Sequence, residues 1–89
     1  MKIIFYGATW CPDCRRSKKF LDERKVDYTY INLEETPDTA AEVEKINKGM
    51  QSIPTIVFPD GTILTEPSNE KLLETLMANH IKMEEIEKL

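Results

Sequence analysis

The sequence predicts a single α/β domain, a four-stranded mixed sheet with helices on both faces, and three observations lead to this fold class. The chain has 89 residues, which is enough for one domain and too few for two. Short β-rich runs alternate with stretches of helical periodicity in the order βαβαββα. Right-handed crossover of the first strand–helix–strand unit, with a hairpin further along, favours a mixed sheet. We expect one domain over residues 1–89, in which residues 80–89 form a C-terminal helical extension.

The first half of the chain predicts a strand, a helix and a second strand. Residues 2–6 form a short apolar, β-rich run that ends at Gly7, as is typical of a buried strand. Pro12 suits the first turn of a helix, where its missing N–H costs nothing, and this helix is expected to extend to about Glu23. Residues 28–32 alternate β-branched and aromatic side chains, which indicates another strand.

The segment that follows predicts a second helix. Thr39 and Glu42 have the spacing of a capping box, and Gly49 marks the expected end of the helix. Apolar side chains recur along it at helical spacing, at Ala40, Val43, Ile46 and Met50.

The last third of the chain predicts a β-hairpin and a C-terminal helix. Residues 55–58 form a β-rich run, residues 59–62 have the composition of a turn, and residues 63–65 form the returning strand. Pro67 and Ser68 are expected to open the last helix. Its apolar face consists of Leu72, Leu73, Leu76 and Met77.

Composition and charge exclude several classes of function. With 12 basic and 16 acidic residues the formal net charge is −4, so the chain gains little from the counterion release that drives nucleic-acid binding. No apolar run approaches the roughly 20 residues that span a bilayer, and the first residues lack the cleavage pattern of a signal peptide. We therefore expect a cytoplasmic, monomeric protein that binds neither nucleic acid nor membrane.

The two cysteines, Cys11 and Cys14, are the strongest indication of chemistry. A small domain stapled by disulfides usually carries several cysteines spread along the chain. A bridge that closes so short a loop would add little stability. A Cys-x-x-Cys pair between a predicted strand and a predicted helix is instead typical of a redox site.

The start of the predicted helix favours the thiolate form of Cys11. The sulfur would face unpaired backbone N–H groups and the positive end of the helix dipole. Arg15 and Arg16 add positive potential, whereas the charge of Asp13 has the opposite effect. Cys14, one turn further along, is expected to face inward and to resolve a mixed disulfide formed by Cys11.

Other interpretations of the cysteine pair stay open. Both cysteines would also be compatible with a purely structural role, although burial does not require this spacing beside a proline. A structural zinc site needs a full set of protein ligands, and beyond the two thiols the chain offers only His80. Two chains together would supply enough thiols for a metal ion or an iron–sulfur cluster.

The aromatic side chains divide into two groups. Trp10 is equally compatible with the core and with a groove beside a reactive sulfur. Tyr6, Tyr28 and Tyr30 fit strand positions, and His80 fits a helix end. We expect structural roles for these four residues.

Two motifs give the sequence a resemblance to a known family. Residues 10–14 read Trp-Cys-Pro-Asp-Cys, and residues 52–55 read Ser-Ile-Pro-Thr ahead of a predicted strand. With these motifs the chain, over about residues 1–80, resembles the glutaredoxin family of the thioredoxin fold. Residues 57–61 and 64–68 make it look most like the mycoredoxin-like branch.

The resemblance implies a site made of the cysteine pair and a neighbouring groove. Cys11 and Cys14 are the implied catalytic residues, which form a disulfide with each other in the oxidised protein. The counterpart of Pro54 in the family is a cis-proline that faces the pair and leaves the backbone of Ile53 free to pair with a thiol peptide. The implied substrate-binding residues are Trp10, Pro12, Gln51, Ile53 and Pro54.

The implied function is that of a small dithiol thiol–disulfide oxidoreductase that reduces protein disulfides or mixed disulfides. The sequence has no nucleotide or flavin motif, so we expect no bound cofactor, and electrons would come from a small thiol or a flavoprotein reductase. Where glutathione-using members carry a lysine and a Gly-Gly pair, this chain has Ala8 and Leu64-Thr65, which leaves the donor open. The alternatives are a redoxin served by a thioredoxin reductase and a dimeric iron–sulfur protein with Cys11 of each chain as a ligand.

Overall fold

The computed structural model describes residues 2–35, 38–46 and 52–83. The elements in these segments follow one another in the order predicted from the sequence. They are β1 (Ile3–Gly7), α1 (Pro12–Glu23), β2 (Tyr28–Asn32), α2 (Thr39–Ile46), β3 (Thr55–Val57), β4 (Ile63–Thr65) and α3 (Asn69–Ala78).

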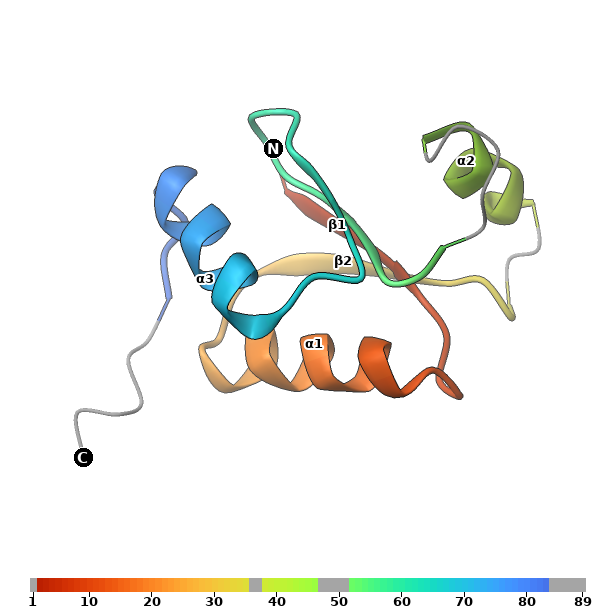
Figure 1. Cartoon of the computed structure of the whole chain (residues 1–89), viewed down its shortest axis with the longest axis horizontal. Coiled ribbons are helices and arrows are strands. Elements are labelled where there is room, and N and C mark those ends of the chain that lie inside the picture. The colour runs from red at the N-terminus through yellow and green to blue at the C-terminus, as the bar shows by residue number, and fades with distance from the viewer. Residues whose placement is uncertain (1, 36–37, 47–51, 84–89) are drawn as a thin grey trace.

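The strands form a four-stranded mixed sheet in the order β2-β1-β3-β4, which confirms the predicted sheet. β1 pairs in parallel with β2, with Ile3 opposite Tyr28 and Gly7 opposite Asn32. β3 pairs antiparallel with both β1 and β4. β1 therefore lies inside the sheet, and the chain passes from its carboxyl end into the cysteine motif at the start of α1 (Figure 1).

Helices cover both faces of the sheet, as expected (Figure 1). α1 and α3 lie next to each other on one face, where Phe5 and Cys14 belong to the same buried cluster. The side chain of Tyr6 points to the opposite face, because successive side chains of a strand alternate. α2 reaches this second face through Glu42, whose carboxylate lies close to Tyr6; burial and then this carboxylate raise the pKa of Tyr6.

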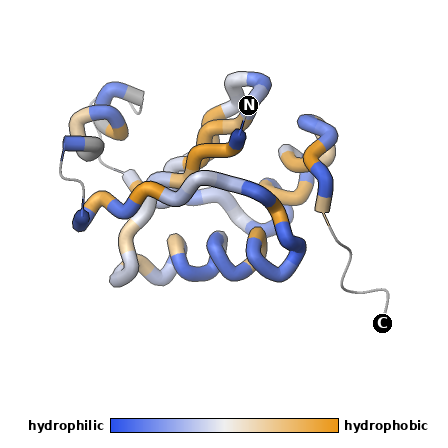
Figure 2. The backbone as a smooth tube through the Cα atoms, turned by 180° about the vertical axis from the view of Figure 1, so that it is seen from behind, coloured by the Kyte–Doolittle hydropathy of each residue, from blue (hydrophilic) through white to orange (hydrophobic). Residues whose placement is uncertain are grey.

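The core forms where α1 and α3 meet the sheet. Figure 2 shows the central strands as hydrophobic and most of α1 as hydrophilic, which is the pattern of a helix that buries a single face. The buried residues of α1 recur at helical spacing, at Cys14, Ser17, Phe20 and Leu21. Cys14 is thus held by the same face of α1 that anchors the helix to the core. None of the helices in the described segments is long and apolar enough to cross a membrane.

Two predicted boundaries in the second half need comment. The strand expected over residues 55–58 ends at Val57, because the N–H of Phe58 donates to the carbonyl of Thr62 at 2.8 Å and closes the hairpin turn. The expected end of the second helix near Gly49 lies outside the described residues.

The helical extension expected over residues 80–89 is wrong for its described part, residues 80–83. α3 ends at Ala78, because His80 adopts a left-handed backbone conformation with φ 56° and the N–H of Ile81 donates back to the carbonyl of Leu76. The apolar residues beyond this turn, Ile81 and Met83, pack against the core without continuing the helix. Residues 84–89 lie outside the described part of the chain.

Candidate functional site

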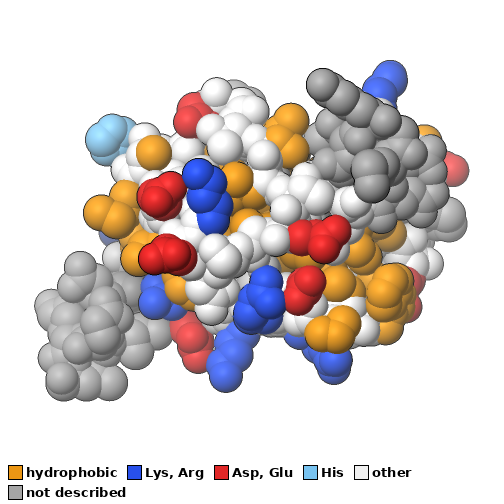
Figure 3. Space-filling model, viewed as in Figure 1, with side chains coloured by type: hydrophobic (Ala, Val, Ile, Leu, Met, Phe, Trp, Pro, Cys, Tyr) orange, Lys and Arg blue, Asp and Glu red, His pale blue; other side chains and the backbone are white. Residues whose placement is uncertain are grey.

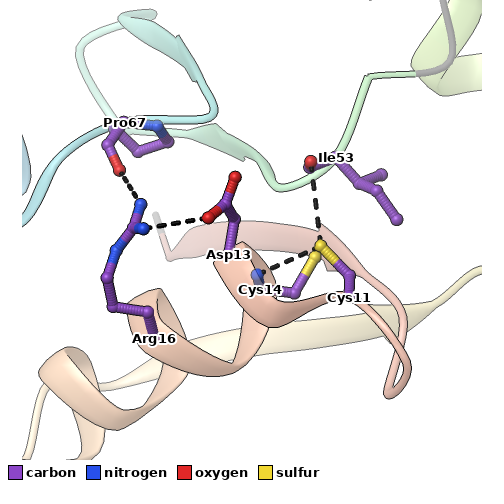
Figure 4. Close-up of polar contacts among 6 residues, drawn as sticks. All are labelled: Cys11, Asp13, Cys14, Arg16, Ile53 and Pro67. Atoms are coloured by element: carbon purple, nitrogen blue, oxygen red, sulfur yellow. Dashed lines mark hydrogen bonds and ion pairs between the residues drawn. The ribbon is translucent and has the colours of Figure 1, made fainter.

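Cys11 caps the N-terminus of α1 (Figure 4). Its backbone is extended, with φ −85° and ψ 115°, and its Sγ accepts a hydrogen bond from the backbone N–H of Cys14 at 3.2 Å. Pro12 follows at the start of the helix, where its nitrogen needs no intrahelical partner. The sulfur of Cys11 therefore lies at the positive end of the helix, an environment that stabilises negative charge.

Cys14 lies one turn inside α1 and is almost completely buried, with 1% of its surface exposed. Burial raises the pKa of Cys14 to about 12, and a hydrogen bond with Cys11 adds to the effect. Cys11 is 6% exposed, and both residues are free thiols in this structure. The pair thus consists of an outer thiol at the helix end and an inner thiol that stays protonated at neutral pH.

The segment before β3 lies opposite Cys11 (Figure 4). The Cys11 thiol donates to the carbonyl oxygen of Ile53, at a distance of 3.9 Å between Sγ and O. The peptide bond between Ile53 and Pro54 is cis, as the family resemblance implied. The carbonyl of Pro54 in turn accepts a hydrogen bond from the N–H of Glu66 at 2.8 Å. We call the backbone of Ile53 and Pro54 the groove wall. Cys11 is therefore flanked by α1 on one side and by the groove wall on the other.

The other predicted groove residues occupy the surface around Cys11. Trp10 has 64% of its surface exposed, which excludes a core position. Pro12 is exposed and Ile53 is half-buried. Gln51 lies outside the described residues. Contact of these residues with a substrate stays a prediction.

Arg16 joins α1 to the loop that precedes α3, a contact that the sequence did not predict. Its Nη1 donates to Oδ1 of Asp13 at 2.9 Å, and its Nη2 donates to the carbonyl oxygen of Pro67 at 2.9 Å (Figure 4). The spacing of Asp13 and Arg16 on a helix indicates an ion pair, but no local signal connects Arg16 with Pro67. Arg16 thus pairs with the carboxylate that we expected to oppose the thiolate of Cys11.

A second contact between distant segments holds the loop ahead of Cys11. Thr9 donates its backbone N–H and its hydroxyl to Oε1 of Glu34, at 3.1 Å and 2.7 Å. These hydrogen bonds lower the pKa of Glu34. In the same region the N–H of Leu33 donates to the carbonyl of Gly7 at 2.9 Å. The loop between β1 and α1 is therefore tied to the residues that follow β2.

A hollow of about 140 Å³ lies beside Cys14, between α1, β2 and the loop ahead of Cys11. It is lined by Ala8, Thr9, Cys14, Arg15, Lys18 and Tyr30. Acidic, basic and hydrophobic side chains are interspersed on the face of the molecule seen in Figure 3. Within the described segments, no group of three or more His, Cys, Asp or Glu side chains is placed to hold a metal ion.

The tyrosines and the histidine occupy the structural positions expected for them. The ring centroids of Tyr28 and Tyr30 lie 5.7 Å and 5.3 Å from that of Phe5, which anchors β2 to β1 on the α1 face. Tyr6 is buried in β1, and His80 follows the end of α3.

We expect the two thiols to differ sharply in alkylation. A raised pKa keeps a thiol in its neutral form, so Cys14, with a pKa of about 12, stays unreactive at mildly alkaline pH. Iodoacetamide at about pH 8 should modify Cys11 alone in the folded, reduced protein, and both cysteines after unfolding in guanidinium chloride, because an unperturbed thiol has a pKa near 8.5. Peptide mapping by mass spectrometry identifies the modified residues. Equal modification of both in the folded protein would contradict the burial of Cys14.

Comparison with known proteins agrees with this geometry. The family model described as Glutaredoxin matches residues 3–63. A glutaredoxin-type protein of Mycobacterium tuberculosis (strain ATCC 25618 / H37Rv) is 31% identical over 75 residues, which cover 84% of this chain and 89% of that protein. Mycoredoxin 1 of Corynebacterium glutamicum (strain ATCC 13032 / K051) is 29% identical over 76 residues, which cover 85% of this chain and 94% of that protein.

The solved structures include one with a similar sequence and the same architecture. The glutaredoxin of Archaeoglobus fulgidus superimposes with a TM-score of 0.70 at 31% identity, and the match covers 82% of this chain and 83% of that one. This likeness confirms the thioredoxin-like fold. Because the family model spans most of the sheet and the whole cysteine motif, the chain belongs to the glutaredoxin family.

Proposed function

We propose that this protein is a small dithiol thiol–disulfide oxidoreductase that reduces protein disulfides or mixed disulfides through Cys11 and Cys14. The observation that carries the proposal is the placement of the two thiols. Cys11 caps α1 with its sulfur on the N–H of Cys14, and Cys14 lies one turn inside the helix. Disulfide exchange by a dithiol needs such an outer nucleophile beside a second thiol that can release it. The similarity to mycoredoxin 1 supports the same activity.

The proposed reaction consists of two exchanges. The Cys11 thiolate attacks one sulfur of the substrate disulfide, and the other substrate sulfur leaves as a thiolate that takes up a proton. Cys14 then attacks Sγ of Cys11 and gives its proton to the second substrate sulfur, so that the internal disulfide forms and the second substrate thiol is released. Because burial raises the pKa of Cys14 to about 12, almost no Cys14 thiolate exists at neutral pH, and the proton of Cys14 passes to the substrate sulfur as that sulfur leaves Cys11. The resolving step is therefore coupled to substrate release.

The surroundings of Cys11 support an extended substrate. The carbonyl of Ile53 lies next to Sγ of Cys11, so a substrate strand that pairs with Ile53 would bring its own cysteine to that sulfur. The exposed ring of Trp10 adds an apolar surface on the same loop. In this proposal Trp10, Pro12, Ile53 and Pro54 contact the substrate, together with Gln51.

The electron donor is the part of the proposal that a coupled assay tests. In this proposal the protein carries no bound cofactor, works as a monomer in the cytoplasm, and receives electrons from a small thiol or a flavoprotein reductase. Oxidised protein is offered NADPH with glutathione and glutathione reductase, or with thioredoxin reductase, in the presence of a peptide disulfide. We expect NADPH consumption with one of the two systems, and none when Cys11→Ser replaces the wild type.

Two outcomes would contradict the proposal. If the chemically reduced protein converts no peptide disulfide to thiols, the oxidoreductase activity itself is wrong. If protein purified without oxygen shows the visible absorption of an iron–sulfur cluster and elutes as a dimer, the alternative cluster-binding function is favoured.

A further inference from the structure

We propose that Arg16 is a positioning residue that keeps the groove wall aligned with Cys11 while the site reacts. The inference rests on the proposed oxidoreductase function. Arg16 lies in the second turn of α1, and its side chain reaches the loop before α3 (Figure 4). A series of contacts connects Arg16 with Cys11 at the start of the same helix, by way of the loop before α3 and the groove wall.

The first part of this series connects Arg16 with the groove wall. Nη2 of Arg16 donates to the carbonyl of Pro67 at 2.9 Å. Glu66, the preceding residue, donates its N–H to the carbonyl of Pro54 at 2.8 Å. The guanidinium of Arg16 therefore holds the backbone segment that in turn holds Pro54.

The second part of the series depends on the protonation of Cys11. The Cys11 thiol attaches the wall to α1 by donating its proton to the carbonyl of Ile53. That proton is absent from the thiolate and from a mixed disulfide, so this attachment is lost when the site reacts. The carbonyl of Ile53 is then free to accept an N–H of the substrate strand. The contact of Arg16 with Pro67 remains in those states, so its contribution is largest when the chemistry takes place.

The chemistry of arginine suits this role better than that of lysine. A planar guanidinium donates to two acceptors in fixed directions, here the carboxylate of Asp13 and the carbonyl of Pro67. The side chains of Arg16 and Asp13 are 44% and 46% exposed, so this ion pair by itself contributes little stability. Asp13 orients the guanidinium instead, and an ammonium group would not satisfy both acceptors in the same geometry.

Two reactions of Cys11 separate a positioning role from a general loss of structure. Reduction of a peptide disulfide uses the groove wall, whereas alkylation by iodoacetamide requires only access to the sulfur. We expect Arg16→Gln to lower kcat/KM for the peptide about tenfold, less than the roughly 10²-fold that a 1 Å misplacement of reacting groups can cost. At sufficiently alkaline pH the rate of Cys11 alkylation no longer rises with pH. In Arg16→Gln this plateau rate should stay within about twofold of the wild-type rate.

Matched variants define which contact matters. Asp13→Asn leaves the contact of Arg16 with Pro67 in place and should keep most of the activity on the peptide disulfide. Arg16→Lys should be more active than Arg16→Gln and less active than the wild type. Lys19→Gln is the control, because Lys19 is a basic residue of α1 that faces Glu23 at 4.0 Å, and it should change neither reaction. Parallel losses of peptide reduction and of plateau alkylation in Arg16→Gln would overturn the proposal.

The contribution of Arg16 should be larger in a mixed disulfide of Cys11 than in the reduced protein, and hydrogen exchange of the Glu66 amide tests this difference. In the Cys14→Ser background, reduced protein is compared with a stable mixed disulfide of Cys11 with a peptide. Arg16→Gln should speed exchange at Glu66 more in the mixed disulfide than in the reduced protein, and equal effects in the two states would contradict the proposal. If the wild type reduces no peptide disulfide, the proposed function fails, while the exchange comparison still decides whether Arg16 holds the wall.

Discussion

Cys11→Ser should abolish reduction of peptide disulfides, with a loss of about 10³-fold or more, because it removes the sulfur that forms the mixed disulfide. Cys14→Ser should keep the first exchange, since the helix end that supports Cys11 is unchanged. This variant lacks the inner thiol, so the mixed disulfide should accumulate after a single turnover. Peptide reduction is followed by chromatography, and the adduct by intact-protein mass spectrometry.

The two variants also test the order of the two thiols. Circular dichroism establishes that both proteins fold before their activities are compared. An adduct that forms on Cys11→Ser and is absent from Cys14→Ser would reverse the assignment of nucleophile and resolving thiol. No adduct on either protein would argue against mixed-disulfide chemistry at this pair.

Gly7→Ala should have a large effect on stability, because Gly7 ends β1 directly beneath the cysteine pair. A Cβ at this position would lie 2.9 Å from Cε1 of Phe5, 3.2 Å from Sγ of Cys14 and 3.3 Å from Cε1 of Tyr30. Overpacking of this kind costs about 1–3 kcal/mol. For a domain of this size each kcal/mol lowers Tm by about 4–8 °C, which thermal denaturation of the reduced protein followed by circular dichroism measures.

A double-mutant cycle identifies the contact responsible. Phe5→Leu removes the ring atom that the new Cβ approaches most closely, so Gly7→Ala should cost less in this background than in the wild type. An equal cost in both backgrounds would mean that the crowding around Phe5 is not the origin of the destabilisation.

Local signals were sufficient to predict the elements that carry the site. The predicted bounds of α1, Pro12 to about Glu23, agree with the structure because a proline and a capping residue define its start within a few positions. The position of Cys11 at the helix end and the inward orientation of Cys14 follow from the same start. The role of these residues in catalysis stays a prediction that the variants above test.

The contacts that complete the site could not be predicted from local patterns. Arg16 and Pro67 are 51 positions apart, and Thr9 and Glu34 are 25 positions apart. The acceptor on Pro67 is a backbone carbonyl, which every residue has, so its identity gives no signal in the sequence. Such contacts depend on how the sheet brings distant loops together, and only the folded structure shows them.

The hairpin between β3 and β4 has a practical consequence for handling this protein. Val57 of β3 lies opposite Ile4, near the amino end of β1, so the hairpin tip and Cys11 lie at opposite ends of β1 (Figure 1). Asp60 at the tip is exposed, whereas Gly61 has φ 93°, a backbone conformation that L side chains rarely adopt, so an attachment site belongs at Asp60 and not at Gly61. A linker attached there would leave the opposite end of β1, where Cys11 lies, directed away from the support, which makes the tip a suitable anchoring point for immobilising the protein on an electrode or a sensor surface.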